Sequence, residues 1–261
     1  MLRLVLLSSW TMKAAASVTR SPAAYADHLQ PRAVGYQPVR RLELRELLAL
    51  ADPVEGHEVL SLACATGWYG RQLLAQGARR VVGVDAYAPM VEEGRRLSAQ
   101  CGDRMSFQCM EPMELSSTAR FDTVFAGWWL CRARSERELG TLYRKAAQLL
   151  RPGGQFLAVC NNPDYALALG DNSRYGVRVL SQRSVGDCPE LVVAFDLDRT
   201  ERVCDRQWSA AQHARAAEAA GLTDLQLRLP LPQAEDLKRG GLEFWQAQLR
   251  NPLSMVLSAR R

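Results

Sequence analysis

The sequence predicts an α/β fold in which a mostly parallel sheet carries helices on both of its faces. Between residues 58 and 161, short apolar runs that suit buried strands alternate with longer runs in which apolar residues recur at helical spacing. A chain of 261 residues, 48% of them hydrophobic, is long enough to form one well-buried core. We therefore expect a single domain built around one sheet.

The N-terminal part of the chain precedes this alternation. Residues 1–21 are expected to be an extension or a disordered segment. They superficially resemble a targeting signal, but their apolar run Leu4–Leu7 is too short to span a membrane. Residues 22–50 have a helical pattern with a leucine-rich stripe, and we expect them to form an N-terminal helical cap. Residues 22–261 then make up the domain.

Five strands are predicted in the first part of the domain. Each is short and apolar on both faces, as the strands of a sheet covered by helices should be. The helix Ser135–Leu150 is marked at its start by Ser135 and Glu138, which suit a capping box, and Pro152-Gly153-Gly154 ends it. The predicted strands are Glu58–Ala63, Arg80–Asp85, Met105–Cys109, Phe121–Gly127 and Gln155–Asn161.

The alternation lapses after the fifth strand. Residues 163–205 are typical of a loop followed by an irregular hairpin, with a strand-like run at Leu191–Leu197. An insertion beyond the carboxyl end of a strand is well placed to cover a site at that edge of the sheet. Two more strands then complete a Rossmann-like, seven-stranded sheet. The elements expected here are the helix Ser209–Ala220, the strand Leu222–Leu229, the helix Leu242–Leu249 and the strand Leu253–Ala259.

Two features at the predicted carboxyl edge favour a nucleotide-binding cleft. The segment Val59–Gly70 runs from a strand through small residues into a helix, so that the backbone can approach a ligand and the helix can offer free N–H groups. Asp85 ends the second strand, eighteen residues beyond Gly67, where a carboxylate can accept hydrogen bonds from both hydroxyls of a ribose. The first feature alone would also suit a close packing turn, and the two together favour the cleft.

With these motifs the chain resembles the class I S-adenosylmethionine (SAM)-dependent methyltransferases, and among them the toxoflavin-synthase-like enzymes that act on small molecules. The resemblance runs from Tyr25 to Arg260. The motifs that carry it are Leu60-Ser61-Leu62-Ala63-Cys64-Ala65-Thr66-Gly67, Val82-Gly83-Val84-Asp85, Leu149-Leu150-Arg151-Pro152-Gly153-Gly154, Asn161-Asn162-Pro163, Tyr175-Gly176 and Phe244-Trp245.

The resemblance implies that SAM is the cofactor and that the carboxyl edge of the sheet binds it. It implies that Asp85 holds the ribose, that Tyr87 and Met90 flank the adenine, and that Gly127 and Trp128 pass close to the sulfonium. The full set of cofactor-binding residues that it implies is Tyr25, Ala63, Cys64, Ala65, Gly67, Asp85, Ala86, Tyr87, Met90, Met110, Glu111, Pro112, Gly127 and Trp128.

Two residues depart from the motif of that family. Ser61 stands where the family has an acidic residue that helps to hold the charged end of the cofactor, and Ala65 adds a methyl group where glycine is usual. Replacing a charge-assisted hydrogen bond by a neutral one costs about 1 kcal/mol. We therefore expect a cofactor affinity that is ordinary or modestly reduced.

Methyl transfer is an in-line displacement, which needs alignment and the exclusion of water rather than a nucleophilic side chain of the protein. Aromatic residues, including Tyr25 and Tyr36, are expected to line the substrate pocket. Neighbours on a strand point opposite ways, so one of Trp128 and Trp129 should face the site and the other should pack against a helix. The candidate catalytic residues are His28 as a base, Trp128, Trp129 and Tyr175, whereas His57 and His213 are expected to be solvated.

The net charge and the cysteine content limit the partners and the cellular location that are expected. The net charge of +5 comes from arginines scattered among acidic residues, which suits a solvated surface rather than a nucleic-acid footprint. Seven cysteines without a C-x-x-C pair predict reduced thiols, a cytoplasmic location and no metal site. We expect a monomer or a homodimer with a small-molecule substrate and no membrane partner.

The predicted function is SAM-dependent methyl transfer to an O or N atom of a small molecule, such as an aromatic or heterocyclic natural-product intermediate. One alternative is a methyltransferase fold repurposed for a non-methylating step such as cyclisation, which Ser61 and Ala65 alone support. A second is a non-catalytic interaction protein. A nicotinamide dehydrogenase is disfavoured because the first loop lacks the spaced glycines that a pyrophosphate needs.

Overall fold

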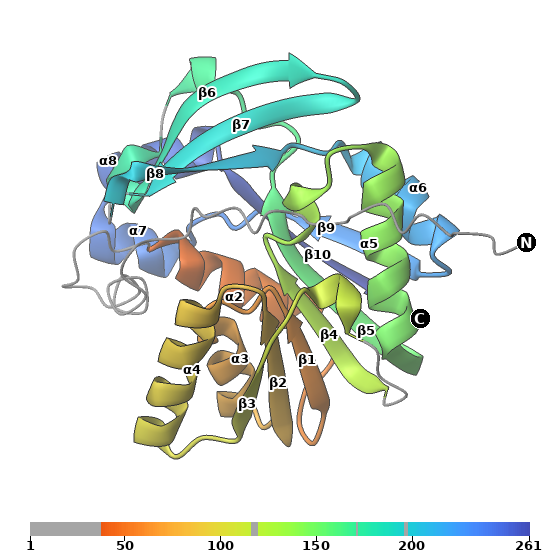
Figure 1. Cartoon of the computed structure of the whole chain (residues 1–261). Coiled ribbons are helices and arrows are strands. Elements are labelled where there is room, and N and C mark those ends of the chain that lie inside the picture. The colour runs from red at the N-terminus through yellow and green to blue at the C-terminus, as the bar shows by residue number, and fades with distance from the viewer. Residues whose placement is uncertain (1–37, 116–119, 171, 196–197) are drawn as a thin grey trace, which may run out of the picture.

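The computed structural model describes residues 38–115, 120–170, 172–195 and 198–261, which form a seven-stranded sheet and a separate three-stranded sheet (Figure 1). The order in the large sheet is β3-β2-β1-β4-β5-β10-β9. Its first five strands in the chain pair in parallel, and β10 is antiparallel to both of its neighbours. This confirms the predicted Rossmann-like, mostly parallel fold. The strands are β1 (Glu58–Leu62), β2 (Arg80–Asp85), β3 (Met105–Cys109), β4 (Phe121–Gly127), β5 (Leu150–Asn161), β9 (Thr223–Arg228) and β10 (Ser254–Arg260).

Helices cover both faces of the large sheet. Leu47, Leu73 and Val91, one from each of the first three described helices, pack into the core on one face. Leu139 and Ala216 belong to the core on the other face. The helices are α2 (Val39–Leu50), α3 (Trp68–Ala75) and α4 (Ala88–Cys101) on the first face, α5 (Glu136–Leu149) and α6 (Ala210–Ala219) on the second, and α7 (Ala234–Gly240) and α8 (Leu242–Arg250), which pack against α2.

The boundary between α5 and β5 differs in detail from the prediction. Ser135 caps α5 by accepting a hydrogen bond from Glu138 N at 3.2 Å, while the Glu138 carboxylate accepts from Arg134 N rather than from Ser135 N. β5 begins at Leu150, five residues before the predicted start at Gln155. Leu150 pairs with Phe121, and the register shift that follows accommodates the proline and the two glycines. The turn expected there is thus a bulge within the strand.

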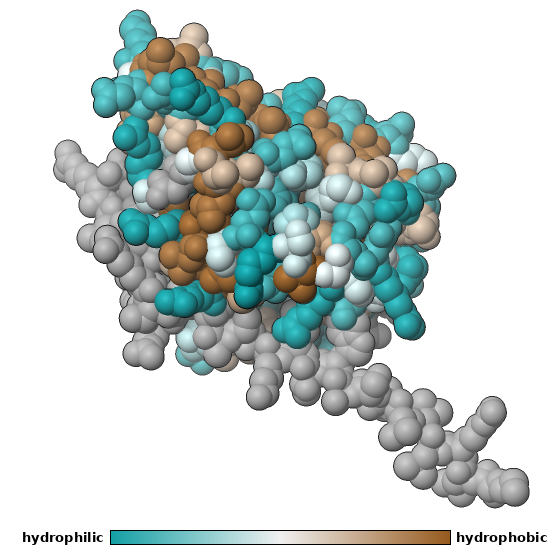
Figure 2. All heavy atoms as spheres, turned by 90° about the horizontal axis from the view of Figure 1, so that it is seen from above, coloured by the Kyte–Doolittle hydropathy of each residue, from teal (hydrophilic) through white to brown (hydrophobic). Residues whose placement is uncertain are grey.

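The insertion forms an antiparallel sheet rather than a loop and an irregular hairpin. Its strands are β6 (Val177–Val185), β7 (Cys188–Phe195) and β8 (Asp198–Arg206), in that spatial order. Tyr165 and Leu253 join its buried apolar residues in a small core of their own. The sheet lies above the carboxyl ends of the parallel strands in Figure 1, and Figure 2 shows hydrophobic side chains gathered in a band between hydrophilic ones when this end is seen from above.

His213 is buried, contrary to the expectation that it is solvated. It lies on α6 with 1% of its surface exposed, and its Nδ1 is 2.8 Å from the Tyr143 hydroxyl of α5. Its Nε2 has no hydrogen-bond partner among the described residues. Because burial penalises the charged ring, the pKa of His213 falls from 6.5 to about 4. The histidine therefore serves as a neutral packing residue between two helices.

The stability of the protein should fall as the pH is lowered from 7 to 4. The unfolded chain binds a proton at His213 near pH 6.5, whereas the folded chain binds it only near pH 4, so acid favours unfolding. This group contributes about 3 kcal/mol of stability at neutral pH that is lost across that window. Urea titrations at several pH values should show a shallower loss in His213→Gln than in the wild type, and equal slopes would contradict the assignment.

Candidate cofactor site

The loop between β1 and α3 has an unusual backbone. Ala63 and Ala65 have φ angles of 50° and 48°, and Gly67, which caps α3, has 87°. The left-handed conformation costs a residue with a Cβ about 1 kcal/mol or more. At Gly67 a Cβ would also lie 2.7 Å from Met105 Cε, so any other residue there would add backbone strain and force the Met105 side chain to move. The loop thus holds strained backbone at the start of a helix whose first N–H groups have no partner within the helix.

Asp85 joins this loop to the end of β2. Its Oδ2 accepts a hydrogen bond from Ala65 N at 2.8 Å, and its Oδ1 accepts one from Tyr87 N at 2.9 Å. Burial raises the pKa of the carboxyl, and the two backbone N–H groups oppose that rise. A carboxylate offers about four acceptor positions, so the two oxygens retain capacity for a pair of hydroxyl groups.

A pocket opens in front of the loop. Five of the predicted cofactor residues line it: Ala63, Cys64, Ala65, Gly127 and Trp128. Five residues that the sequence analysis gave no role also line it: Arg40, Thr66, Trp68, Tyr69 and Phe125. Ser61 is not part of this lining. It is buried in β1, with 1% of its surface exposed, and pairs with Gly83 and Phe125 in the sheet.

Arg40 brings a positive charge to the pocket. Its guanidinium lies 4.9 Å from the centroid of the Trp128 ring and donates to Glu43 Oε2 at 3.1 Å. The Tyr69 hydroxyl also donates to that oxygen. Glu43 is 1% exposed and Arg40 is 7% exposed. Burial of the Tyr69 hydroxyl raises its pKa, and the negative charge of Glu43 adds to the effect. This buried network ties α2 to the first turn of α3, which follows the cofactor loop.

A signal for this network exists in the sequence. Arg40 and Glu43 lie one helical turn apart, on the same face of α2 as the buried Leu47. Charged residues of opposite sign on an apolar stripe indicate a buried pair, because isolated charges are rarely buried. The leucines of this helix predict its buried face, and the charged pair beside them is the signal that was missed.

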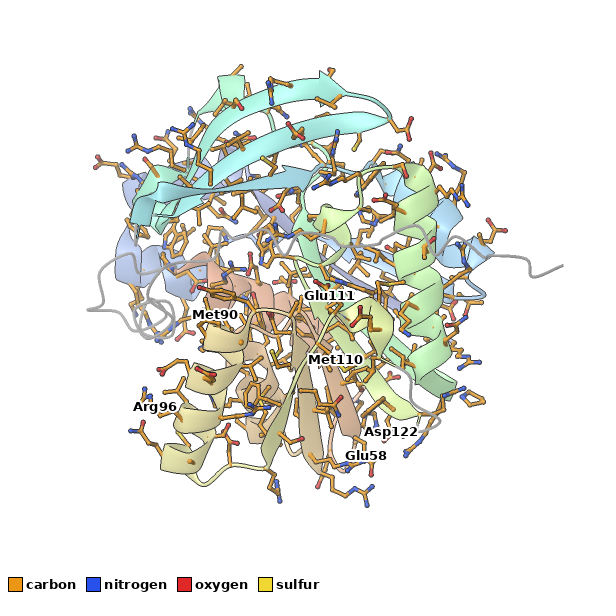
Figure 3. All side chains as sticks on the ribbon, in the orientation of Figure 1. Glu58, Met90, Arg96, Met110, Glu111 and Asp122 are labelled. Carbon is orange, nitrogen blue, oxygen red and sulfur yellow. The ribbon has the colours of Figure 1, made fainter. Side chains whose placement is uncertain are left out.

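The remaining described residues of the predicted set form a wall beside Asp85. Met110 N donates to Asp85 O at 3.0 Å, and Cys109 Sγ lies 3.9 Å from Ala86 O. The nearby Asp85 and Glu114 charges add to partial burial in raising the pKa of Glu111. Figure 3 shows Met90, Met110 and Glu111 at this same edge of the sheet. Pro112 begins the short helix η1 (Pro112–Glu114) behind them, and Tyr87 is the N-cap of α4.

Two of the predicted catalytic residues lie away from the pocket. Trp129 is 4% exposed and packs in the core with α5, so Trp128 is the member of the pair that faces the site. Tyr175 is 1% exposed and stacks on Trp245 with ring centroids 5.6 Å apart. Its hydroxyl donates to Phe244 O and accepts from Gln248 N, so its hydrogen bonds serve α8. Trp129 is thus the member of the pair that packs against a helix, as expected for one of the two, and Tyr175 packs and hydrogen-bonds against α8. A contact of either residue with a substrate stays a prediction.

Other predicted residues lie outside the part of the chain that the structure describes. Tyr25, Tyr36 and His28 precede residue 38, so their place relative to the pocket is untested. Within the described ranges, no group of three or more His, Cys, Asp and Glu side chains is placed to hold a metal ion. No helix in these ranges has both the length and the apolar character that a membrane crossing requires.

Comparison with known proteins gives a partial match in sequence. Residues 59–154 match the model of a family described as a methyltransferase domain. An uncharacterized methyltransferase of Schizosaccharomyces pombe is 30% identical to this chain over 106 residues, which are 40% of this chain and 39% of that protein. The matched part thus spans well under half of the length of this relative.

Solved structures share the fold over most of the chain. A SAM-dependent methyltransferase from Mesorhizobium loti superposes with a TM-score of 0.63 at 18% identity, covering 84% of this chain and 98% of that one. The complex of DhpI with SAM and HEP superposes with a TM-score of 0.54 at 18% identity, covering 85% and 86%. The chain therefore has the fold of SAM-dependent methyltransferases. The part that matches the methyltransferase domain family begins in β1 and ends within β5.

The residues of the site fit SAM. Asp85 has acceptor capacity left for the ribose hydroxyls, and the strained loop beside it brings small residues and a helix start to the pocket. Arg40, which lines the pocket and pairs with Glu43, is the cation that would meet the carboxylate of the methionine end.

Substituting Ala65→Gly should stabilise the protein. Glycine adopts the φ of 48° without a Cβ penalty, so we expect a gain of about 1 kcal/mol and a rise in Tm of about 3 °C. Ala51→Gly is the matched control, because Ala51 has a φ of −72° and should lose stability. A thermal melt in which Ala65→Gly is neutral or destabilised would show that the loop is not strained.

Substituting Arg40→Met should weaken the binding of S-adenosylhomocysteine (SAH) about tenfold to a hundredfold, because a charge-assisted hydrogen bond is lost. 5′-Methylthioadenosine lacks the amino-acid end and should bind both proteins equally. Arg45→Met, which removes an arginine of the same helix that pairs with Asp236, should leave both affinities unchanged. Calorimetry that found equal losses for both ligands would rule out the carboxylate contact.

Proposed function

We propose that this chain is a SAM-dependent methyltransferase that modifies an N or O atom of a small molecule, such as an aromatic or heterocyclic natural-product intermediate. The observation that carries the proposal is the Asp85 carboxylate, which bridges the strained loop and the β2–α4 turn beside a pocket lined by Arg40. The methyltransferase domain match at residues 59–154 supports it.

Bound SAM supplies an electrophilic methyl group on a sulfonium. The chain's own residues would bind and orient it: Asp85 at the ribose, the first N–H groups of α3 and Arg40 at the amino-acid end, and Trp128 beside the methyl group. Because the Arg40 guanidinium covers the Trp128 ring, that face of the indole is not available to a flat substrate. A substrate would therefore approach along the other side of Trp128 or its edge.

The insertion supports a small acceptor. Its sheet lies over the carboxyl ends of the strands, and the core that it shares with Tyr165 and Leu253 fixes it there. A covered site suits a molecule that can be enclosed, whereas a nucleic-acid site is an open, basic groove. The start of this segment carries two motifs shared with the toxoflavin-synthase-like group, Asn161-Asn162-Pro163 and Tyr175-Gly176. We assign the chain to that group within this proposal.

A cytoplasmic location is part of the same proposal. All seven cysteines lie in the described residues as free thiols. Burial raises the pKa of Cys131, and that of Cys64 in the loop also lies well above its usual value, so both remain protonated and inert. Free thiols in such number suit a reducing compartment.

Calorimetry with SAM and SAH tests the proposal directly. The wild type should bind both saturably, and Asp85→Asn should weaken binding about tenfold to a hundredfold through lost charge-assisted hydrogen bonds. Asp122→Asn is the control, because Asp122 lies at the opposite end of the sheet beside Glu58 (Figure 3). An absence of heat with either ligand would refute the cofactor assignment, and product formation without SAH release would favour the repurposed alternative.

A further inference from the structure

A second group of buried polar side chains lies where the insertion meets the large sheet. β8 packs against η2 (Leu130–Arg132), the short helix that follows the end of β4. Arg132 Nε lies 3.5 Å from Asp205 Oδ1 of β8. Asn161, the last residue of β5, donates from Nδ2 to Arg206 O at 3.1 Å. These contacts place Asp205 at the carboxyl ends of β4 and β5, the edge that carries the cofactor pocket.

Three polar atoms at this edge have no hydrogen-bond partner among the described residues. They are Asp205 Oδ1, Asn161 Oδ1 and Trp128 Nε1. Asp205 is 6% exposed and Asn161 is 1% exposed. Buried polar atoms are nearly always paired, and leaving one unpaired is costly. Asp205 Oδ1 has its ion pair with Arg132 and no hydrogen bond, and Asn161 Oδ1 and Trp128 Nε1 have no hydrogen bond among the described residues. Together these atoms point to a ligand that offers the complementary groups.

The charges around Asp205 limit what that ligand can be. Arg132 of η2 compensates the carboxylate, and Arg40 of α2 is near enough for its charge to act on the same group. Leu191 of β7 pairs beside Asp205 and is apolar, and Cys131 of η2 is a buried thiol. Burial raises the pKa of Asp205, while the two arginines oppose the rise. A cationic ligand would meet two arginines here, so an uncharged donor is favoured.

We propose that Asp205 binds the acceptor substrate by taking a hydrogen bond from the uncharged N–H or O–H group that is methylated. The proposal rests on the function proposed above and adds to it the substrate class and the residue that selects it. A donor held by Asp205 has its nitrogen or oxygen fixed in orientation at the edge of the site that Trp128 lines. Asp205 is thus a specificity-determining residue contributed by the insertion.

The test compares paired probes on the SAH-saturated protein by NMR titration. Phenol and imidazole offer a donor, whereas anisole and N-methylimidazole do not, and imidazole is used at a pH at which it is neutral. The wild type should bind each donor about tenfold more tightly than its partner, the equivalent of one hydrogen bond. Asp205→Asn keeps only a neutral acceptor in place of the carboxylate, so it should reduce that preference several-fold without changing the Kd for SAH.

Asp187→Asn is the matched control, because it removes another carboxylate of the insertion at an exposed turn; it should keep the full preference. If Asp205→Asn does not fold, Asp205→Glu retains the charge while displacing the oxygen, and it should reduce the preference. An unchanged preference in the folded variant, or no preference in the wild type, overturns the proposal. A protein that does not bind SAH contradicts the proposed function instead.

Discussion

The two hydrogen bonds that Asp85 accepts from backbone N–H groups are the interaction on which the site depends. They connect the loop after β1 to the turn after β2, two segments that the parallel sheet brings side by side. Charge-assisted hydrogen bonds are among the stronger ones in proteins, and these two are largely buried. They hold Ala65 in a conformation that it would not adopt alone, so the shape of the cofactor loop is set by a residue of a different strand.

Close packing behind the loop completes the constraint. A Cβ on Gly83 would lie 2.7 Å from Cys64 Sγ, and one on Gly67 would meet Met105 at a similar distance. The Cys64 side chain therefore packs directly against the backbone of β2 at Gly83. Of the four described non-glycine residues with positive φ, three line the pocket: Ala63, Ala65 and Trp128. Strain of this kind persists only where surrounding contacts fix it, and here it gathers at the site.

The sequence predicted the central sheet better than its surroundings, for physical reasons. β2, β3 and β4 have the predicted bounds because short apolar runs between helices have few other structures. β6 to β8 were harder to predict, because charged residues such as Arg178, Arg183 and Glu190 interrupt the apolar pattern of the sequence there. Tyr175 was assigned to the site because its motif suggested function, whereas its ring and hydroxyl serve α8. The role of Arg40 depends on Trp128 and Tyr69, which only the fold brings close to it.

The position of β10 has a consequence for how the molecule is assembled. β10 lies between β5 and β9 and is antiparallel to both, although β9 precedes it in the chain. β9 therefore has no strand to pair with until β10 has been synthesised and inserted. A nascent chain can close the half of the sheet formed by β1 to β5 before β10 is made, while the other half must wait for β10. The two halves of this sheet are therefore completed at different times during synthesis.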